Sequence, residues 1–160
     1  MGIYVRAYRQ LTPGEAELRD GVDPVDPVTK AYIGDTCMVA FVNPFFPQYA
    51  DQLQHQGVYN FAEKVHVIHT AYTHYSEWLQ ELTKMVKESS GRPGSFEELI
   101  VQANSASGLI GPVTSAKLAE DFNYHDPLAR AVSYPDFYLI YTNFRRGFEA
   151  ASDNGAVVLS

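Results

Sequence analysis

The first residues of the chain alternate between two kinds of side chain. The positions with small or aliphatic side chains are Ile3, Val5 and Ala7, and those between them are Tyr4, Arg6 and Tyr8. A period of two predicts a strand over 2–8 with both faces at least partly covered. A glycine turn and a short apolar run over 153–160 predict another strand, so we expect the two chain ends to pair in one sheet.

Further apolar runs at 36–42, 57–61 and 64–69 predict strands between these ends. Simple alternation over the last run would place Val65, Val67 and His69 on one face, and His66 and Ile68 on the other. The segment 12–35 is rich in proline, glycine and acidic residues, which predicts a long loop. In NPFFPQYADQL, residues 43–53, the prolines on either side of Phe45 and Phe46 predict a turn.

After residue 70 the apolar period changes to three or four, which predicts a helix. Its apolar stripe is Ala71, Tyr75, Trp78, Leu79, Leu82 and Val86. We expect Thr70 to cap this helix and the SSGRPG segment to end it. A short helix follows over 95–103, where Ser95 and Glu98 have the spacing of a capping box.

Two more helices are predicted in the second half of the chain. One begins at Pro112 and has four apolar residues that we expect to face inward, Val113, Leu118, Ala119 and Phe122. The other spans about 135–151 and has an apolar face formed by Phe137, Ile140, Tyr141, Phe144 and Phe148. Because strands come first, then helices and a final strand, the order favours an α+β fold. We expect one globular domain over 1–160, with a small antiparallel or mixed sheet and about four helices packed on it.

The composition limits the class of partner. The chain has 12 Lys and Arg against 19 Asp and Glu, a net charge of −7, and no basic run. Duplex nucleic acid is therefore not an expected partner, because binding it requires several cationic contacts to phosphates. A local pocket for one small anion stays open. The 11 Tyr and 9 Phe suit both mixed cores and binding surfaces.

A single cysteine, Cys37, excludes an internal disulfide and a cysteine-based zinc site. It lies in an apolar run, where we expect a buried thiol. The five histidines show no metal-site spacing, so we predict no metal and no cofactor. No apolar stretch approaches the roughly 20 residues of a membrane span, and no signal peptide is evident. We expect a cytoplasmic protein without a membrane partner.

The stretch NSASGLIGPVTSAKL, residues 104–118, is the main candidate site. Small polar residues and two glycines precede a proline at a helix start, where backbone N–H groups and the helix dipole favour an anion. The predicted ligand-binding residues are Asn104, Ser105, Ser107, Gly108 and Gly111 here, with His69, Tyr72 and Arg145 elsewhere. The stretch matches no phosphate-binding consensus, so an ordinary helix start is the alternative. We predict no catalytic residue, because no triad or dyad is recognisable.

Several blocks of the chain together resemble a family of small accessory proteins of tailed bacteriophages and prophages. The blocks are MGIYVRAYRQL, NPFFPQYADQL, AYTHYSEWLQEL, IGPVTSAKLAEDF and FRRGFEAASDNGAV. Members mostly lack an assigned function. In that family the loop before Ile110 often carries acidic residues and a cysteine, and here it does not. The resemblance therefore implies a phage context, in an infected host cell, and supplies no activity.

The preferred functional hypothesis is a non-catalytic phage protein that counters the host by sequestering a small nucleotide-like anion. Its proposed elements are the start of the helix at 112, the tyrosine-rich helix from 71, and Arg145 with Arg146. A second hypothesis is an inhibitor of a host protein that makes contact through NPFFPQY or the acidic segment 15–26. A third is a small nucleotide-acting enzyme with His69 or His74 as base. Assembly into a homo-oligomer stays open.

Overall fold

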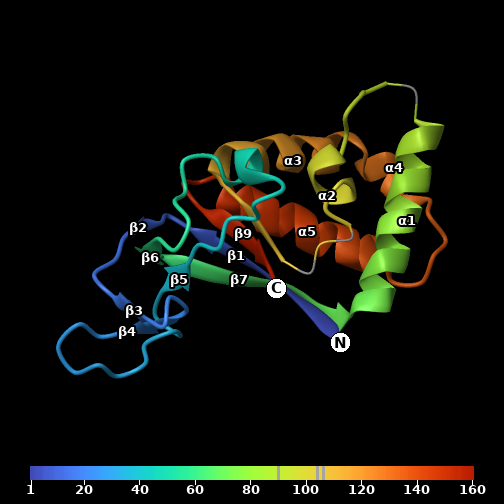
Figure 1. Cartoon of the computed structure of the whole chain (residues 1–160). Helices are drawn as coiled ribbons and strands as arrows, with labels where there is room; N and C mark the ends of the chain where they lie inside the picture. The colour runs from blue at the N-terminus through green and yellow to red at the C-terminus, as the bar shows by residue number, and fades with distance from the viewer. Residues whose placement is uncertain (90, 104, 106) are drawn as a thin grey trace.

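A computed structural model describes residues 1–89, 91–103, 105 and 107–160, and its fold is α+β (Figure 1). The strands are β1 (Gly2–Arg9), β2 (Thr12–Pro13), β3 (Glu17–Arg19), β4 (Asp23–Val25), β5 (Met38–Val39), β6 (Val58–Asn60), β7 (Glu63–Ala71), β8 (Gly108–Ile110) and β9 (Ala156–Leu159). The helices are α1 (Tyr72–Glu88), α2 (Glu97–Ile100), α3 (Pro112–Tyr124), α4 (Asp126–Arg130) and α5 (Phe137–Ala151), with a 3-10 turn at Pro47–Ala50. The predicted fold class is confirmed.

The main sheet is antiparallel and has the strand order β7-β1-β9-β8. The predicted pairing of the two chain ends is confirmed, because Val5 lies opposite Leu159 and Tyr8 opposite Ala156. The alternation in β1 is also confirmed: Ile3, Val5 and Ala7 are buried in the core. β8, whose residues we had included in a loop, is an edge strand of this sheet.

The predicted alternation of β7 is wrong, because a β-bulge interrupts it. Val5 lies opposite Ile68 and Arg6 opposite His66, so Val67 is the extra residue in β7. Val67 and Ile68 are both buried although they are adjacent. A bulge shifts the pleat by one residue, so His66 and His69 lie on the same face of the sheet instead of on opposite faces.

The helices cover one face of the main sheet and enclose the larger core (Figure 1). Both predicted long apolar stripes contribute to it, with Trp78 of α1 stacked on Phe144 of α5 at 4.8 Å between ring centroids. The predicted stripe of α3 is wrong at Val113, which is 69% exposed.

The predicted helix caps are wrong for α1 and α2. Thr70 lies inside β7, and Ala71 precedes α1 without a side-chain cap. Ser95 donates a hydrogen bond to the carbonyl of Arg92 instead of capping α2. Thr70 is therefore part of a strand, and Ser95 stabilises the turn that precedes α2.

The other face of the main sheet is covered only in part, by segments from the first third of the chain. The segment 12–35 holds the short strands β2, β3 and β4, so the expected long loop is in part a hairpin of β3 and β4. The strand predicted at 36–42 shortens to β5, which pairs with β6. A smaller core lies beneath these segments, where Tyr8 and Leu109 of the main sheet meet Met38.

Within the described residues, no helix combines the length and the apolar character needed to cross a membrane.

Candidate functional site

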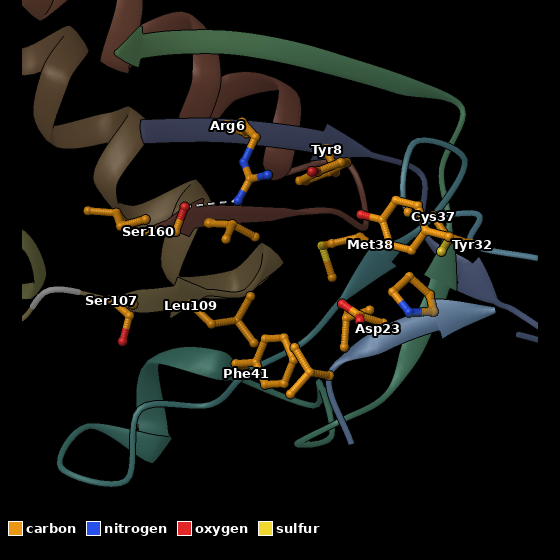
Figure 2. Close-up of a pocket in the computed structure, with 17 residues that line it drawn as sticks. Arg6, Tyr8, Asp23, Tyr32, Cys37, Met38, Phe41, Ser107, Leu109 and Ser160 are labelled. Carbon is orange, nitrogen blue, oxygen red and sulfur yellow. Dashed lines mark hydrogen bonds between the residues drawn. The ribbon is translucent and has the colours of Figure 1, made fainter. Parts of the chain in front are cut away.

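A cavity of about 300 Å³ lies between the partly covered face of the main sheet and the segment 22–41. This volume is at the lower end of the range of about 300–1,000 Å³ that is typical of small-molecule sites. β1, β8 and β9 form its floor, and β4, β5 and the residues beside them form its opposite wall (Figure 2). The cavity thus joins segments that are far apart in the sequence.

Three aromatic side chains contribute to the walls of this cavity. Tyr8 rises from the sheet, while Tyr32 and Phe41 approach from the covering segment (Figure 2). Tyr32 is 58% exposed and Phe41 41% exposed, which is high for large aromatic residues. Exposed aromatic rings around a concavity offer flat apolar surfaces on which a planar ligand can stack.

Arg6 supplies the positive charge of the cavity. Its Nη2 donates a hydrogen bond to Ser160 Oγ at 3.0 Å, and its Cζ lies 4.7 Å from the ring centroid of Tyr4. Nε is buried and makes no hydrogen bond to the described residues. Among the ion pairs of the described residues none involves Arg6. A guanidinium with donors left over and no carboxylate beside it is suited to hold an anion.

The ionisable side chains of the cavity other than Arg6 are Tyr8, Tyr32, Cys37 and Asp23. Burial raises the pKa of the Tyr8 hydroxyl, against the opposing effect of Arg6. Burial also raises the pKa of the Cys37 thiol, whose Sγ lies 3.6 Å from the carbonyl oxygen of Ile33. Tyr8 and Cys37 are therefore protonated near neutral pH, and neither is an activated nucleophile or base.

The loop predicted to bind a ligand contributes to this cavity only through its second half. Ser107 and Gly108 line the cavity, whereas Ser105 accepts a hydrogen bond from Asn43 Nδ2 at 3.3 Å. Gly108 is buried in β8, and a Cβ there would lie 2.7 Å from Gln102 Oε1. This glycine therefore serves close packing, not a phosphate loop. The remaining loop residue of the prediction, Asn104, lies outside the described residues.

The start of α3, where we expected an external anion, already holds a carboxylate of the chain itself. Asp51 accepts hydrogen bonds from the Thr114 N–H and from Thr114 Oγ1, both at 3.0 Å. Gly111 permits this approach, because a Cβ there would lie 2.5 Å from the carbonyl oxygen of Ala50. Asp51 thus acts as an N-cap supplied from a distant part of the chain. The helix start does not need an external anion.

We expect Asp51→Asn to lower the free energy of unfolding by about 1–2 kcal/mol, because it removes the charge at the helix start and replaces one of the two oxygens that accept from Thr114 with an amide group. Asparagine tolerates the positive φ of 54° at this position, so the change adds no backbone strain. Urea denaturation followed by circular dichroism measures the difference. Asp35→Asn, at an exposed position, is the control and should change stability by less than about 0.5 kcal/mol. Equal effects of the two substitutions would contradict the capping role.

The other predicted site residues lie apart from the cavity. His69 is exposed on β7, and the Tyr72 hydroxyl on α1 donates a hydrogen bond to the Ala103 carbonyl. Arg145 on α5 donates to Asp126 Oδ1 at 2.8 Å, so its charge is balanced within the fold. The structure therefore does not gather the predicted residues into one site.

A buried Ser95–His125 pair resembles part of a catalytic dyad but has the wrong hydrogen bonding for one. His125 Nε2 lies 2.9 Å from Ser95 Oγ, whose single hydrogen is directed to the Arg92 carbonyl. Nε2 must then donate to Ser95, so it is not the base that a serine nucleophile needs. Nδ1 is buried and unpaired among the described residues. Burial lowers the pKa of His125, an effect that Arg92 reinforces and Asp121 opposes.

This depressed pKa predicts a pH-dependent stability. Below about pH 6.5 the unfolded chain binds a proton that the folded His125 does not. The free energy of unfolding therefore decreases as the pH is lowered, until the folded pKa is reached. The loss approaches at most about 1.4 kcal/mol per pH unit in that window. Urea denaturation at pH 7.5 and pH 5.5 should therefore show a smaller difference for His125→Gln than for the wild type. The same difference in both proteins would refute the assignment.

Sequence reasoning missed Arg6, although the signal for it was present. Alternation in β1 already placed Arg6 between Tyr4 and Tyr8 on one face. The pattern of the last helix instead favoured Arg145 and Arg146 for anion binding, because they lie opposite its apolar stripe. An arginine between two tyrosines on a central strand was the better indication.

No three His, Cys, Asp or Glu side chains gather as a possible metal site within the described part of the chain.

In comparisons with models of known protein families, with curated protein sequences and with solved structures, the chain matches none of them. The resemblance to phage accessory proteins therefore stays a prediction.

Proposed function

We propose that this protein binds and sequesters a small nucleotide-like anion in the cavity beside Arg6, without transforming it. The observation that carries the proposal is the guanidinium of Arg6, which lines a cavity with three aromatic side chains and makes no ion pair with an acidic side chain of the described residues. In the context that the sequence suggests, the protein is a phage accessory protein that counters its host from within the cytoplasm of the infected cell.

The walls of the cavity suit the parts of a nucleotide. Tyr32 and Phe41 offer faces for a base, and Arg6 offers donors for a phosphate. Asp23, which also lines the cavity and pairs loosely with Arg19 at 3.5 Å, offers acceptors for amino or hydroxyl groups of the ligand. A base, a sugar and a phosphate thus each have a complementary group.

The protonated state of two side chains in the cavity supports binding without catalysis. Cys37 and Tyr8 both have raised pKa values because they are buried. A nucleotide-transforming enzyme would need an activated base or nucleophile near the ligand. Neither group is in that state at neutral pH.

Thermal denaturation with a panel of nucleotides tests the proposal. A ligand present at 100 times its Kd stabilises the folded state by about 2.7 kcal/mol, which raises the melting temperature measurably. We expect such a rise for the wild type, a loss of it in Arg6→Gln, and its retention in the control Arg146→Gln, at an exposed arginine. If no nucleotide raises the melting temperature, the proposal fails. Ligand recovered chemically altered after denaturation would instead indicate an enzyme, with His69 or His74 as candidate bases.

An inhibitor of a host protein is a second candidate, favoured by the exposure of the NPFFPQY turn. Phe45 is 82% exposed between Pro44 and Pro47, so its ring is available for contact with a partner. This candidate and nucleotide binding are separated by Phe45→Ser, which should leave nucleotide-induced stabilisation unchanged.

A further inference from the structure

The cavity lies at the edge of a larger open surface on the main sheet. Residues directly opposite each other in an antiparallel pair share a face of the sheet. Arg6 therefore lies on the same face as Tyr4 and the partner of Tyr4, His69. The helices cover the other face, and the segment 22–41 covers only the end near Tyr8 (Figure 1). We call this surface the open face; it is formed by Tyr4, Arg6, His66, His69, Val158 and Ser160. Each of these side chains is exposed or half-buried.

The charge of the open face is opposite to that of the protein as a whole. The chain has a net charge of −7, yet none of these described positions has an acidic side chain. The nearest acid of β7, Glu63, lies opposite Arg9 and is 3.4 Å from its Nε, on the other side of the strand. An anion that reaches Arg6 therefore meets no acidic side chain among the residues that form the open face.

The open face also provides an aromatic platform next to Arg6. The ring of Tyr4 lies 5.3 Å from that of His66 and 5.4 Å from that of His69, between centroids. The bulge at Val67 creates this cluster, because it brings both histidines to the face of Tyr4. The guanidinium of Arg6 thus lies between two aromatic groups, the cavity on one side and the Tyr4 platform on the other.

From this arrangement we infer that the ligand is a dinucleotide, with one base in the cavity, the bridging phosphate at Arg6 and the second nucleoside over Tyr4, His66 and His69. The inference rests on the proposed function and extends it. A mononucleotide would fill the cavity and leave the platform unused. A duplex is excluded as the ligand because the face offers a single arginine, whereas a duplex requires several cationic contacts.

Calorimetric titration with the four 5′-mononucleotides and the corresponding 3′–5′-linked dinucleotides tests the inference. We expect at least one dinucleotide to bind about tenfold more tightly than its mononucleotide, the usual effect of one stacked base. Tyr4→Leu should remove this advantage and leave the mononucleotide Kd within about twofold. Arg6→Gln should weaken both ligands about tenfold or more. Tyr124→Leu, at an exposed tyrosine outside the open face, is the control and should change neither.

The outcomes distinguish the inference from the proposed function. If dinucleotides and mononucleotides bind equally and Tyr4→Leu affects neither, the second subsite is refuted and the proposed function stands. If Tyr4→Leu weakens both ligands equally, Tyr4 only positions Arg6, and the second subsite is again refuted. If no nucleotide of either length binds, the proposed function itself fails.

Discussion

Replacing Asp121 with asparagine should lower the free energy of unfolding by about 3–5 kcal/mol, the usual cost of breaking a buried ion pair. Asp121 is fully buried on α3. It accepts hydrogen bonds from Arg92 Nε at 2.8 Å and from the Phe96 N–H at 3.0 Å, and it lies 2.8 Å from Lys117 Nζ. Asparagine keeps the size but turns an amide group toward one of the two cations. The carboxylate therefore ties α3 to the segment that precedes α2.

Urea denaturation followed by circular dichroism measures this loss, and Glu120→Gln is its matched control. Glu120 is the adjacent acid, 72% exposed at its side chain, and it pairs with the same Arg92 at 3.3 Å. Exposed ion pairs contribute little, so this substitution should cost less than about 1 kcal/mol. A similar cost for the two substitutions would show that burial does not increase the contribution of Asp121 to stability.

Trp78→Ala should cost about 3–5 kcal/mol, because it empties the centre of the larger core. Trp78 is fully buried, stacks on Phe137 and Phe144, and donates a hydrogen bond from Nε1 to the Phe137 carbonyl at 3.2 Å. Its removal leaves a cavity between α1 and α5 and removes one hydrogen bond to the Phe137 carbonyl.

The loss from Trp78→Ala is measured by urea denaturation followed by circular dichroism, since the substitution also removes the only tryptophan fluorescence. Gln80→Ala, at an exposed position of the same helix, should change stability by less than about 0.5 kcal/mol. A loss below about 1 kcal/mol at Trp78 would contradict the central place of this side chain in the core.

Much of the fold follows from local periodicity. The alternation in β1 and the stripe of α5 each bury an apolar set on one side, and such patterns are visible without tertiary information. The pairing of the chain ends followed from two strand patterns at opposite termini.

The features that sequence reasoning missed depend on contacts between distant segments. The bulge at Val67 places His66 and His69 on the same face of the sheet, and no residue in KVHVIH predicts it. Asp51 caps a helix that begins 61 positions later, and Asp121 lies inside an apolar stripe because cations from elsewhere reach it. Each is a polar group satisfied by a partner that spacing along the chain does not reveal.

The candidate site was located only in part for the same reason. Ser107 and Gly108 were predicted and do line the cavity, but for a different purpose from the one that we assigned. The cavity depends on Tyr32 and Phe41, which reach β1 only after the segment 22–41 folds across the sheet. Propensities along the chain do not place that segment.

Mass spectrometry of the bound ligand tests the central claim most directly. The purified protein is incubated with the small-molecule extract of bacterial cells, re-isolated and denatured, and the released compounds are identified. We predict a phosphate-containing, base-bearing compound, recovered unaltered from the wild type and from Arg146→Gln, and absent from Arg6→Gln. Recovery of no such compound from the wild type, or equal recovery from Arg6→Gln, would contradict a ligand site at Arg6.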